Sequence, residues 1–212
     1  MNFLTKTSLF FLCILSMSLS SHCTEKKDGE TKRIICLGDS LTAGFGLKKE
    51  QAYPALLQKE LDASSEAWKV VNAGVSGNTS AGGLRRLNWY FSQKVDVLIL
   101  ALGANDGLRG LNIDKTYENL EKTIIRARDK YPDIRIIIAG MKVPPNMGED
   151  YCTKFEALFP KLASKHKCEL IPFLLKDVAG IVECNQADGI HPNSKGQQQV
   201  MKNVLNVLRP KE

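Results

Sequence analysis

The chain has 212 residues, of which 43% are hydrophobic and 25% charged, and its formal net charge is +6 at pH 7. These values fit one globular domain with a sizeable core and exclude an extensively disordered protein. The lysines are dispersed and no basic stripe is interleaved with aromatic residues, so the composition argues against a nucleic-acid-binding protein.

The first residues have the order of a secretory signal. Lys6 is followed by an apolar run, too short to span a bilayer comfortably, and by the small polar cluster 20–23. We therefore expect residues 1–22 to be a signal peptide and the protein to be exported to a bacterial periplasm, or to be held on a membrane as a lipoprotein if the Cys23 thiol is lipidated. The sequence before Cys23 only loosely resembles a lipobox, since His22 stands where Gly, Ala or Ser is usual.

The rest of the chain alternates between short apolar runs and longer amphipathic segments. Residues 23–32, rich in Lys, Glu, Asp and Gly, are expected to be a flexible tether, followed by a single domain over 33–212. The runs predict strands at 33–37, 69–73, 95–102, 134–140 and 169–173, and the segments predict helices near 52–63, 79–92, 115–130, 152–166 and 194–208. This alternation predicts a parallel sheet covered by helices on both faces.

The cysteine spacing gives no metal-binding pattern. Cys36 lies in a predicted strand, where it is expected to be a small apolar filler. Two of Cys152, Cys168 and Cys184 could form a disulfide in an exported protein, and the pairing stays open. Because no C-x-x-C pair occurs, we expect no zinc site.

Polar groups follow the predicted strands where ligands bind in such sheets, outside the carboxyl ends. Ser40 follows the first strand, glycine-rich segments 74–83 and 103–107 follow the second and third, and Asp188 and His191 precede the last helix. We therefore expect all of them to converge on one rim.

These residues include the parts of an acyl-transfer site. His22 belongs to the signal region and His166 to the exposed, lysine-rich end of a predicted helix, which leaves His191 as the general base. Ser40 is a candidate nucleophile, and the Asp188 carboxylate three positions before His191 could orient the imidazole. Each has a plainer alternative: a helix cap or turn serine, a hydrogen-bonded turn histidine, and an Asx turn.

Three candidate donors could stabilise a developing oxyanion. They are the backbone N–H of Ser40, the backbone N–H of Gly77 and the side-chain amide of Asn105. The alternatives are a turn that requires positive φ at Gly77 and a loop-capping amide at Asn105.

Taken in order, these segments closely resemble the four blocks of the GDSL, or SGNH, hydrolases: Gly38-Asp39-Ser40-Leu41, Gly77, Gly103-Ala104-Asn105-Asp106, and Asp188-Gly189-Ile190-His191-Pro192. Within that family, the segments 102–110 and 170–173 are most similar to the bacterial group of thioesterase I, lysophospholipase and arylesterase. The chain departs from the α/β-hydrolase elbow, because Thr42 stands where Gly-x-Ser-x-Gly would demand glycine.

The resemblance implies a flavodoxin-like three-layer α/β/α sandwich with a five-stranded parallel sheet. It implies Ser40 as nucleophile, His191 as base and Asp188 as its partner. It also implies an oxyanion hole made by Ser40, Gly77 and Asn105, with supporting roles for Asp39 and Asp106.

We accordingly expect a monomeric serine esterase that needs no cofactor or metal and hydrolyses ester or thioester bonds of lipid-like acyl substrates, including lysophospholipids. Leu108, Leu111 and the loop 141–148 are candidates for the wall of an apolar acyl pocket. The connection 141–150, which holds two prolines and a glycine, is expected to be a mobile loop beside the cleft.

Two alternatives stay open. One is a carbohydrate O-acetyl esterase, which shares the catalytic set and differs in the pocket. The other is a non-catalytic surface lipoprotein or binding module. The intact set of serine, glycine, asparagine and histidine argues against this second alternative, because a binder would not need all four.

Overall fold

A computed structural model of the chain describes residues 31–64 and 67–209. Its five strands form one sheet in the order β2-β1-β3-β4-β5, with every neighbouring pair parallel. The strands are β1 (Lys32–Gly38), β2 (Trp68–Gly74), β3 (Val97–Ala101), β4 (Arg135–Ala139) and β5 (Glu169–Ile171). This is the flavodoxin-like strand order, so the predicted fold class is confirmed.

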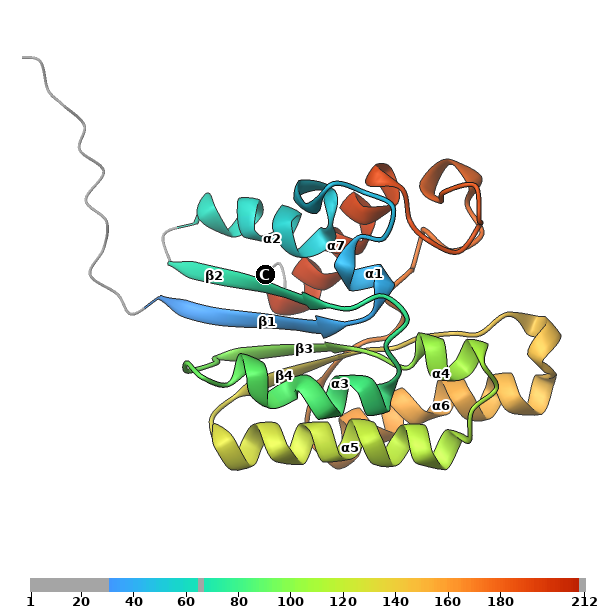
Figure 1. Ribbon diagram of the computed structural model, residues 1–212, viewed down its shortest axis with the longest axis horizontal. Helices are drawn as coiled ribbons and strands as arrows, with labels where there is room; N and C mark the ends of the chain where they lie inside the picture. Colours follow the sequence, from blue (N-terminus) through green and yellow to red (C-terminus); the bar gives the residue numbers. More distant parts are fainter. Residues whose placement is uncertain (1–30, 65–66, 210–212) are drawn as a thin grey trace, which may run out of the picture.

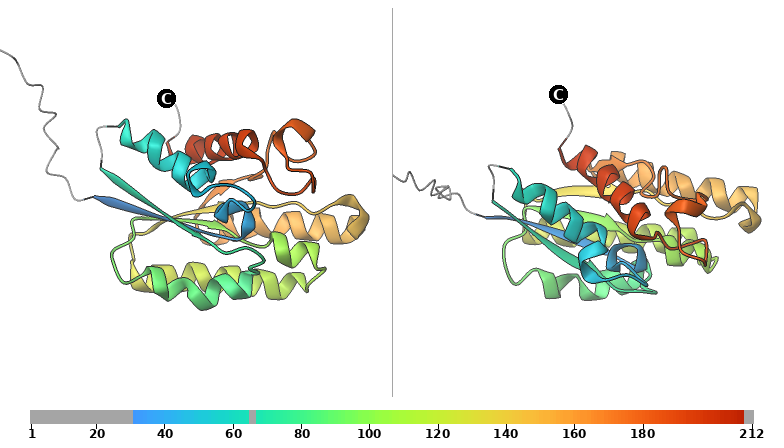
Figure 2. Two further views of the ribbon diagram at one scale, coloured as in Figure 1. Left: turned by 45° about the horizontal axis from the view of Figure 1, so that its top comes forward. Right: turned by 90° about the horizontal axis from the view of Figure 1, so that it is seen from above.

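Helices cover both faces of the sheet, as Figures 1 and 2 show. The α-helices are α1 (Ser40–Ala43), α2 (Tyr53–Asp62), α3 (Ser80–Arg86), α4 (Ala104–Leu108), α5 (Ile113–Lys130), α6 (Glu149–Lys165) and α7 (Ser194–Leu208). Short 3₁₀ turns are η1 (Lys49–Gln51), η2 (Leu87–Tyr90), η3 (Pro145–Met147) and η4 (Val182–Cys184). Helices α2 and α7 lie on one face, and α3 and α5 lie on the other with α6 beside α5.

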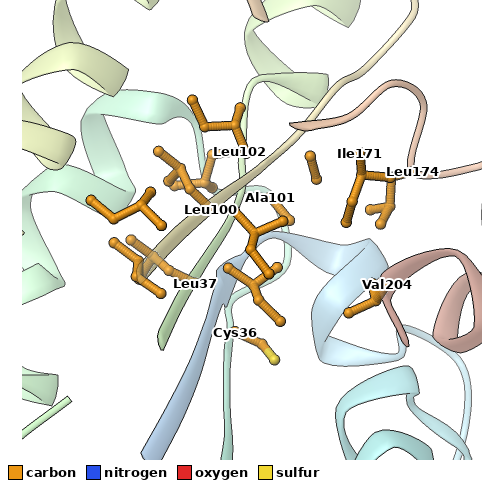
Figure 3. Close-up of a cluster of buried hydrophobic side chains, with 14 of the residues drawn as sticks. Cys36, Leu37, Leu100, Ala101, Leu102, Ile171, Leu174 and Val204 are labelled. Atoms are coloured by element: carbon orange, nitrogen blue, oxygen red, sulfur yellow. The ribbon is translucent and has the colours of Figure 1, made fainter. Parts of the chain in front are cut away.

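The core lies between the sheet and these two helical layers. All five residues of β3 are buried, which is why its sequence is a continuous apolar run. Figure 3 shows the packing where β1 and β3 meet the segment after β5, with Cys36 among the buried side chains. Cys36 is therefore an apolar filler, as expected.

The other cysteines do not form a disulfide in the structure. Cys152, Cys168 and Cys184 are free thiols, as is Cys36. Within residues 31–64 and 67–209, no group of three or more His, Cys, Asp or Glu side chains is placed to hold a metal ion. No helix in the same ranges is long and apolar enough to cross a membrane.

The structure differs from the sequence-based expectation in three helical segments. Residues 104–108 form the short helix α4, which was not predicted because the glycines at 103 and 107 indicate a loop. The helix expected over 79–92 is an α-helix to Arg86 followed by η2. The connection after β4 is shorter than expected, because α6 begins at Glu149 with two acidic residues in its first turn.

The expected signal peptide, Cys23 and residues 23–30 of the expected tether lie outside the described residues. The tether was expected to reach residue 32, but β1 already begins at Lys32, where the sheet pairs it with Trp68.

Candidate active site

Ser40 lies immediately beyond the carboxyl end of β1, at the first position of α1. The helix is capped by Asp39, whose Oδ1 accepts a hydrogen bond from the Leu41 N–H at 3.0 Å. The turn is tight: a Cβ added to Gly38 would come within 1.9 Å of the Thr42 hydroxyl. The capping role considered for Ser40 therefore belongs to its neighbour, and the Ser40 hydroxyl is available for other contacts.

His191 bridges Ser40 and Asp188, residues that lie far apart in the sequence. Its Nε2 is 3.0 Å from Ser40 Oγ, and its Nδ1 is 2.7 Å from Asp188 Oδ2. A carboxylate acceptor at Nδ1 fixes the proton on that nitrogen, so Nε2 is free to accept the hydroxyl proton of Ser40. The structure thus brings together the serine, histidine and aspartate that the sequence predicted.

Asp188 is held as an anion by its own loop. Its Oδ1 accepts hydrogen bonds from the backbone N–H groups of His191 and Ile190, both at 2.9 Å. The backbone bond from His191, the side-chain bond from the same residue and the Ile190 bond lower the Asp188 pKa to about 2. An ionised Asp188 stabilises a positively charged imidazolium.

His166, which was expected to be exposed, is half-buried instead. It follows the last residue of α6, and its Nε2 contacts Glu121 Oε1 at 2.8 Å. This separate contact agrees with its exclusion from the candidate site.

Two residues beside His191 were not predicted from the sequence. The Phe45 ring packs against the imidazole, with centroids 4.6 Å apart and planes tilted by 39°. The Gln186 side-chain amide donates to the backbone oxygens of Phe45 at 2.7 Å and Pro192 at 3.1 Å. Gln186 therefore fastens the loop that carries His191 to the loop that follows Ser40. No local pattern distinguishes either residue in the sequence.

The Gly77 donor candidate lies in a turn just beyond β2. Gly77 has φ +75°, and an added Cβ would meet nothing closer than an Arg109 nitrogen at 3.7 Å, so the backbone conformation and not space demands glycine. The turn is fastened to β1 through the Val75 N–H, which donates to Gly38 O at 3.1 Å. The turn-forming role considered for Gly77 is thus real, and it places the turn beside the strand that leads to Ser40.

The Asn105 donor candidate lies in the first turn of α4, beyond β3. Its Nδ2 donates to Asn78 O at 3.0 Å, next to Gly77. Because Gly38 pairs with Gly74 on one side and Ala101 on the other, the segments beyond β1, β2 and β3 emerge side by side. The predicted convergence on one rim is therefore observed for these segments.

The two supporting aspartates differ in their surroundings. Asp39 is fully buried and its Oδ2 has no hydrogen-bond partner among the described residues, and burial raises its pKa to about 6. Asp106 is buried but well partnered: it accepts from the Ser80 N–H at 2.8 Å, the Ser80 hydroxyl at 2.5 Å and the Thr116 hydroxyl at 3.3 Å. Asp106 therefore ties α4 to α3 and α5.

The residues predicted to wall an acyl pocket fall in different environments. Leu108 and Leu111 are exposed to 41% and 40% near the end of α4. Leu111 lines a hollow of about 840 Å³ between the start of α5 and α6, and Leu108 does not. The loop 141–148 was the other candidate for the pocket wall. Its residues Met141 and Val143 are buried and pack in the core.

Comparison with known proteins shows the same family that the sequence motifs resemble, over most of the chain. A model of the GDSL-like Lipase/Acylhydrolase family matches residues 36–199. The esterase TesA of Pseudomonas aeruginosa is 38% identical over 178 residues, which cover 84% of this chain and 88% of that protein. An arylesterase of Vibrio mimicus is 33% identical over 88% of this chain and 92% of its own length.

The thioesterase 1/protease 1/lysophospholipase L1 of Escherichia coli K12 is 34% identical over 84% of this chain and 83% of its own length. Among solved structures, the crystal structure of TesA superimposes with a TM-score of 0.80 at 37% identity, covering 84% of this chain and 99% of that one. The similarity therefore extends over nearly the whole of the described fold.

Proposed function

This chain belongs to the GDSL-like Lipase/Acylhydrolase family and is an esterase of that family, and from that premise we propose that Ser40, His191 and Asp188 are its catalytic triad. The observation that carries the proposal is the pair of His191 contacts, 3.0 Å to Ser40 Oγ and 2.7 Å to Asp188 Oδ2. The first contact puts Nε2 within hydrogen-bond reach of the Ser40 hydroxyl proton that must move, and the second orients the imidazole to receive it.

The first half of the reaction makes an acyl-enzyme. His191 Nε2 takes the hydroxyl proton as Ser40 Oγ forms a bond to the substrate carbonyl carbon, and the carbonyl oxygen becomes negative. The N–H groups of Ser40 and Gly77 and the Asn105 amide donate to that oxygen. When the intermediate collapses, the bond to the leaving alcohol or thiol breaks, and His191 returns its proton to the departing oxygen or sulfur.

The second half releases the acid. His191 takes a proton from water, the hydroxide oxygen attacks the acyl carbon, and a second negative tetrahedral intermediate forms. Its collapse breaks the bond to Ser40 Oγ, which regains a proton from His191. The products are a carboxylic acid and the free enzyme. The Asp188 anion stabilises the imidazolium in both halves.

The substrates proposed are carboxylic esters and thioesters of medium or long acyl groups, including lysophospholipids. Support comes from the names of the relatives, which include an arylesterase and a thioesterase 1/protease 1/lysophospholipase L1 at 33% and 34% identity. Exposed Leu108 and Leu111, near the end of the helix that carries Asn105, supply apolar surface for such a chain. A carbohydrate O-acetyl esterase is not favoured by these similarities.

The test is hydrolysis of chromogenic esters from acetyl to palmitoyl by the purified protein and its Ser40→Ala variant. We expect activity that peaks at medium or long chains and is lost in the variant, with an unchanged thermal unfolding midpoint. Activity retained by Ser40→Ala would refute the nucleophile. A peak at acetyl would favour glycan acetyl esters over lipid-type substrates. A folded wild type without activity would favour the alternative of a non-catalytic binding module.

Export is the remaining part of the proposal. The order of charged, apolar and small polar residues in 1–22 supports a signal peptide, and Cys23 is a candidate for lipidation. Mass spectrometry of the mature protein distinguishes the outcomes. A diacylglyceryl-modified Cys23 would place the enzyme on a membrane, an unmodified N-terminus near residue 20 would place it free in the periplasm, and retention of residue 1 would refute export.

A further inference from the structure

Arg86, at the end of α3, is a buried cation that the proposed mechanism does not use. The residue is 4% exposed, whereas Arg85 beside it is exposed. The Arg86 guanidinium donates to four acceptors: Gly38 O at 2.6 Å, Ala73 O at 2.6 Å, Asn78 Oδ1 at 2.8 Å and the Tyr90 hydroxyl at 3.2 Å. All four acceptors are neutral oxygens, so the charge is balanced by dipoles and not by a bonded carboxylate.

Three of these acceptors belong to the segments that carry the proposed oxyanion donors. Gly38 ends β1, two residues before Ser40, and Ala73 lies near the end of β2. Asn78 directly follows Gly77 in the turn beyond β2. The Asn78 backbone oxygen in turn accepts the Asn105 side-chain amide at 3.0 Å. One guanidinium is thus linked to the segments of all three donors, directly for two of them and through Asn78 for the third.

A role in stability alone does not account for this arrangement. Gly38 O already accepts a hydrogen bond from the Val75 N–H at 3.1 Å, so it would be satisfied without Arg86. Taking a guanidinium out of water costs several kcal/mol, and an apolar side chain of similar size is often the more stable choice at a buried site. The planar fork of Arg has one property that an apolar residue lacks: it fixes several acceptors at set distances and angles.

We propose that Arg86 is a positioning residue for the oxyanion hole. It sets the Ser40 N–H, the Gly77 N–H and the Asn105 amide at the mutual spacing that a tetrahedral intermediate requires. Catalysis is sensitive to such spacing, because a displacement of about 1 Å can cost on the order of 10²-fold in rate. The inference rests on the proposed function, since it assigns a role within the same site.

The test compares Arg86→Lys with Arg85→Lys. The first keeps the charge and loses the fork, and the second makes the same change on the exposed neighbour. Asn78→Ala is a further variant, which removes one acceptor and leaves Arg86 in place. For each protein we would measure kcat and KM on an ester that the wild type hydrolyses, unfolding in urea, and the calorimetric Kd of phenylboronic acid, which forms a tetrahedral adduct with a reactive serine.

For Arg86→Lys we expect kcat to fall about 10²-fold, with KM changed less than about threefold and the boronate Kd raised by a factor that follows kcat. Arg85→Lys should match the wild type in all three values. For Asn78→Ala we expect a fall in kcat of about tenfold, again with a weaker boronate adduct.

Several results would overturn the inference. A folded Arg86→Lys with wild-type kcat and boronate affinity would do so, and so would a loss of activity explained entirely by the unfolded fraction in urea. If Arg86→Lys does not fold, Asn78→Ala decides, and wild-type values for that variant would refute the role. Failure of the proposed function is distinguishable, because the wild type itself would then show neither Ser40-dependent hydrolysis nor a boronate adduct. Failure of the Arg86 role alone would leave both in the wild type and give Arg86→Lys the same values.

Discussion

The two halves of the proposed site are built differently. Around Ser40 the polar residues are buried and their bonds join distant parts of the chain: Arg86 reaches Gly38 across 48 residues, and Asp106 reaches Ser80 across 26. Around His191 the contacts are mostly local, since Asp188 binds the backbone of the next few residues and its side chain is 39% exposed.

This difference predicts which property of the protein, its stability or its rate, depends on each half. The nucleophile half is positioned by the sheet itself, so changes there should alter folding energy as well as rate. The acid-base half is one loop, which Gln186 fastens to the loop that follows Ser40, so most changes there should alter rate alone. Substitutions in the two halves should therefore differ in their effect on the free energy of unfolding.

His191→Ala should show rate loss without destabilisation. Removal of the base should lower kcat about 10⁴-fold or more, as in other serine hydrolases. The free energy of unfolding should change by less than about 1 kcal/mol, because the side chain is partly exposed and packs mainly against exposed Phe45. Parallel kinetics and urea unfolding measure both quantities. A loss of several kcal/mol in stability would break the contrast.

Asn105→Ala probes the other half. Loss of one oxyanion donor should lower kcat about 10²- to 10³-fold with little change in KM. The variant should also be less stable by about 1 kcal/mol, because the bond from Asn105 Nδ2 to Asn78 O is lost. Steady-state kinetics with urea unfolding checks the pair of effects. A change confined to KM would argue against the oxyanion role.

Asp39→Asn should change stability in a pH-dependent way. The folded-state pKa of about 6 lies above the ordinary value of 3.8, so the Asp39 contribution is fully present below about pH 4 and is lost as the pH rises through 6. At pH 8 the asparagine variant should therefore be more stable than the wild type by up to about 3 kcal/mol, and the difference should vanish near pH 4.

The measurement is urea unfolding of Asp39→Asn from pH 4 to pH 8. Asp133→Asn, on an exposed aspartate, is the matched control and should show no such trend. A pH-independent difference would mean that Asp39 is not the titrating group.

Gln186→Ala is expected to have the smallest effect. It removes the side-chain bond to Phe45 O, which fastens the His191 loop to the loop after Ser40, and the bond to Pro192 O within the His191 loop. We expect kcat to fall about tenfold at nearly constant KM and the free energy of unfolding to change by less than about 1 kcal/mol, because neither bond is fully buried. Gln198→Ala, on the exposed side of α7, is the control. Equal kcat values for the two variants would show that the loop holds its position without this link.

The sequence predicts the scaffold well because the physical signal is local. The five strands are apolar runs long enough to be recognised one by one, and the parallel order follows from their alternation with helices. Helix α4 was missed because Gly103 and Gly107 indicate a loop. In the structure Gly107 is required by packing, since an added Cβ would lie 2.3 Å from Val143 and 2.8 Å from Phe155.

In the site, too, residues with a local sequence pattern could be predicted, and residues placed by packing could not. Ser40 stands in a short motif at the end of β1, and Asp188 and His191 stand in another just before the last helix, so their convergence could be predicted. Arg86 could not, because Arg85 and Arg86 are adjacent and alike in sequence, and only the packing of α3 decides which of them is buried. Residues that act through long-range hydrogen bonds leave no local pattern.

The ends of the described chain have a practical consequence. Lys32 opens β1, and the Leu208 backbone oxygen accepts from Arg135 at the start of β4 at 2.8 Å, so both ends lie at the amino edge of the sheet, opposite the rim that holds Ser40 (Figure 1). A carrier protein, bead or electrode linker joined ahead of residue 32 or after residue 208 would leave the catalytic rim facing solution. The fold is thus suited to oriented immobilisation from either end.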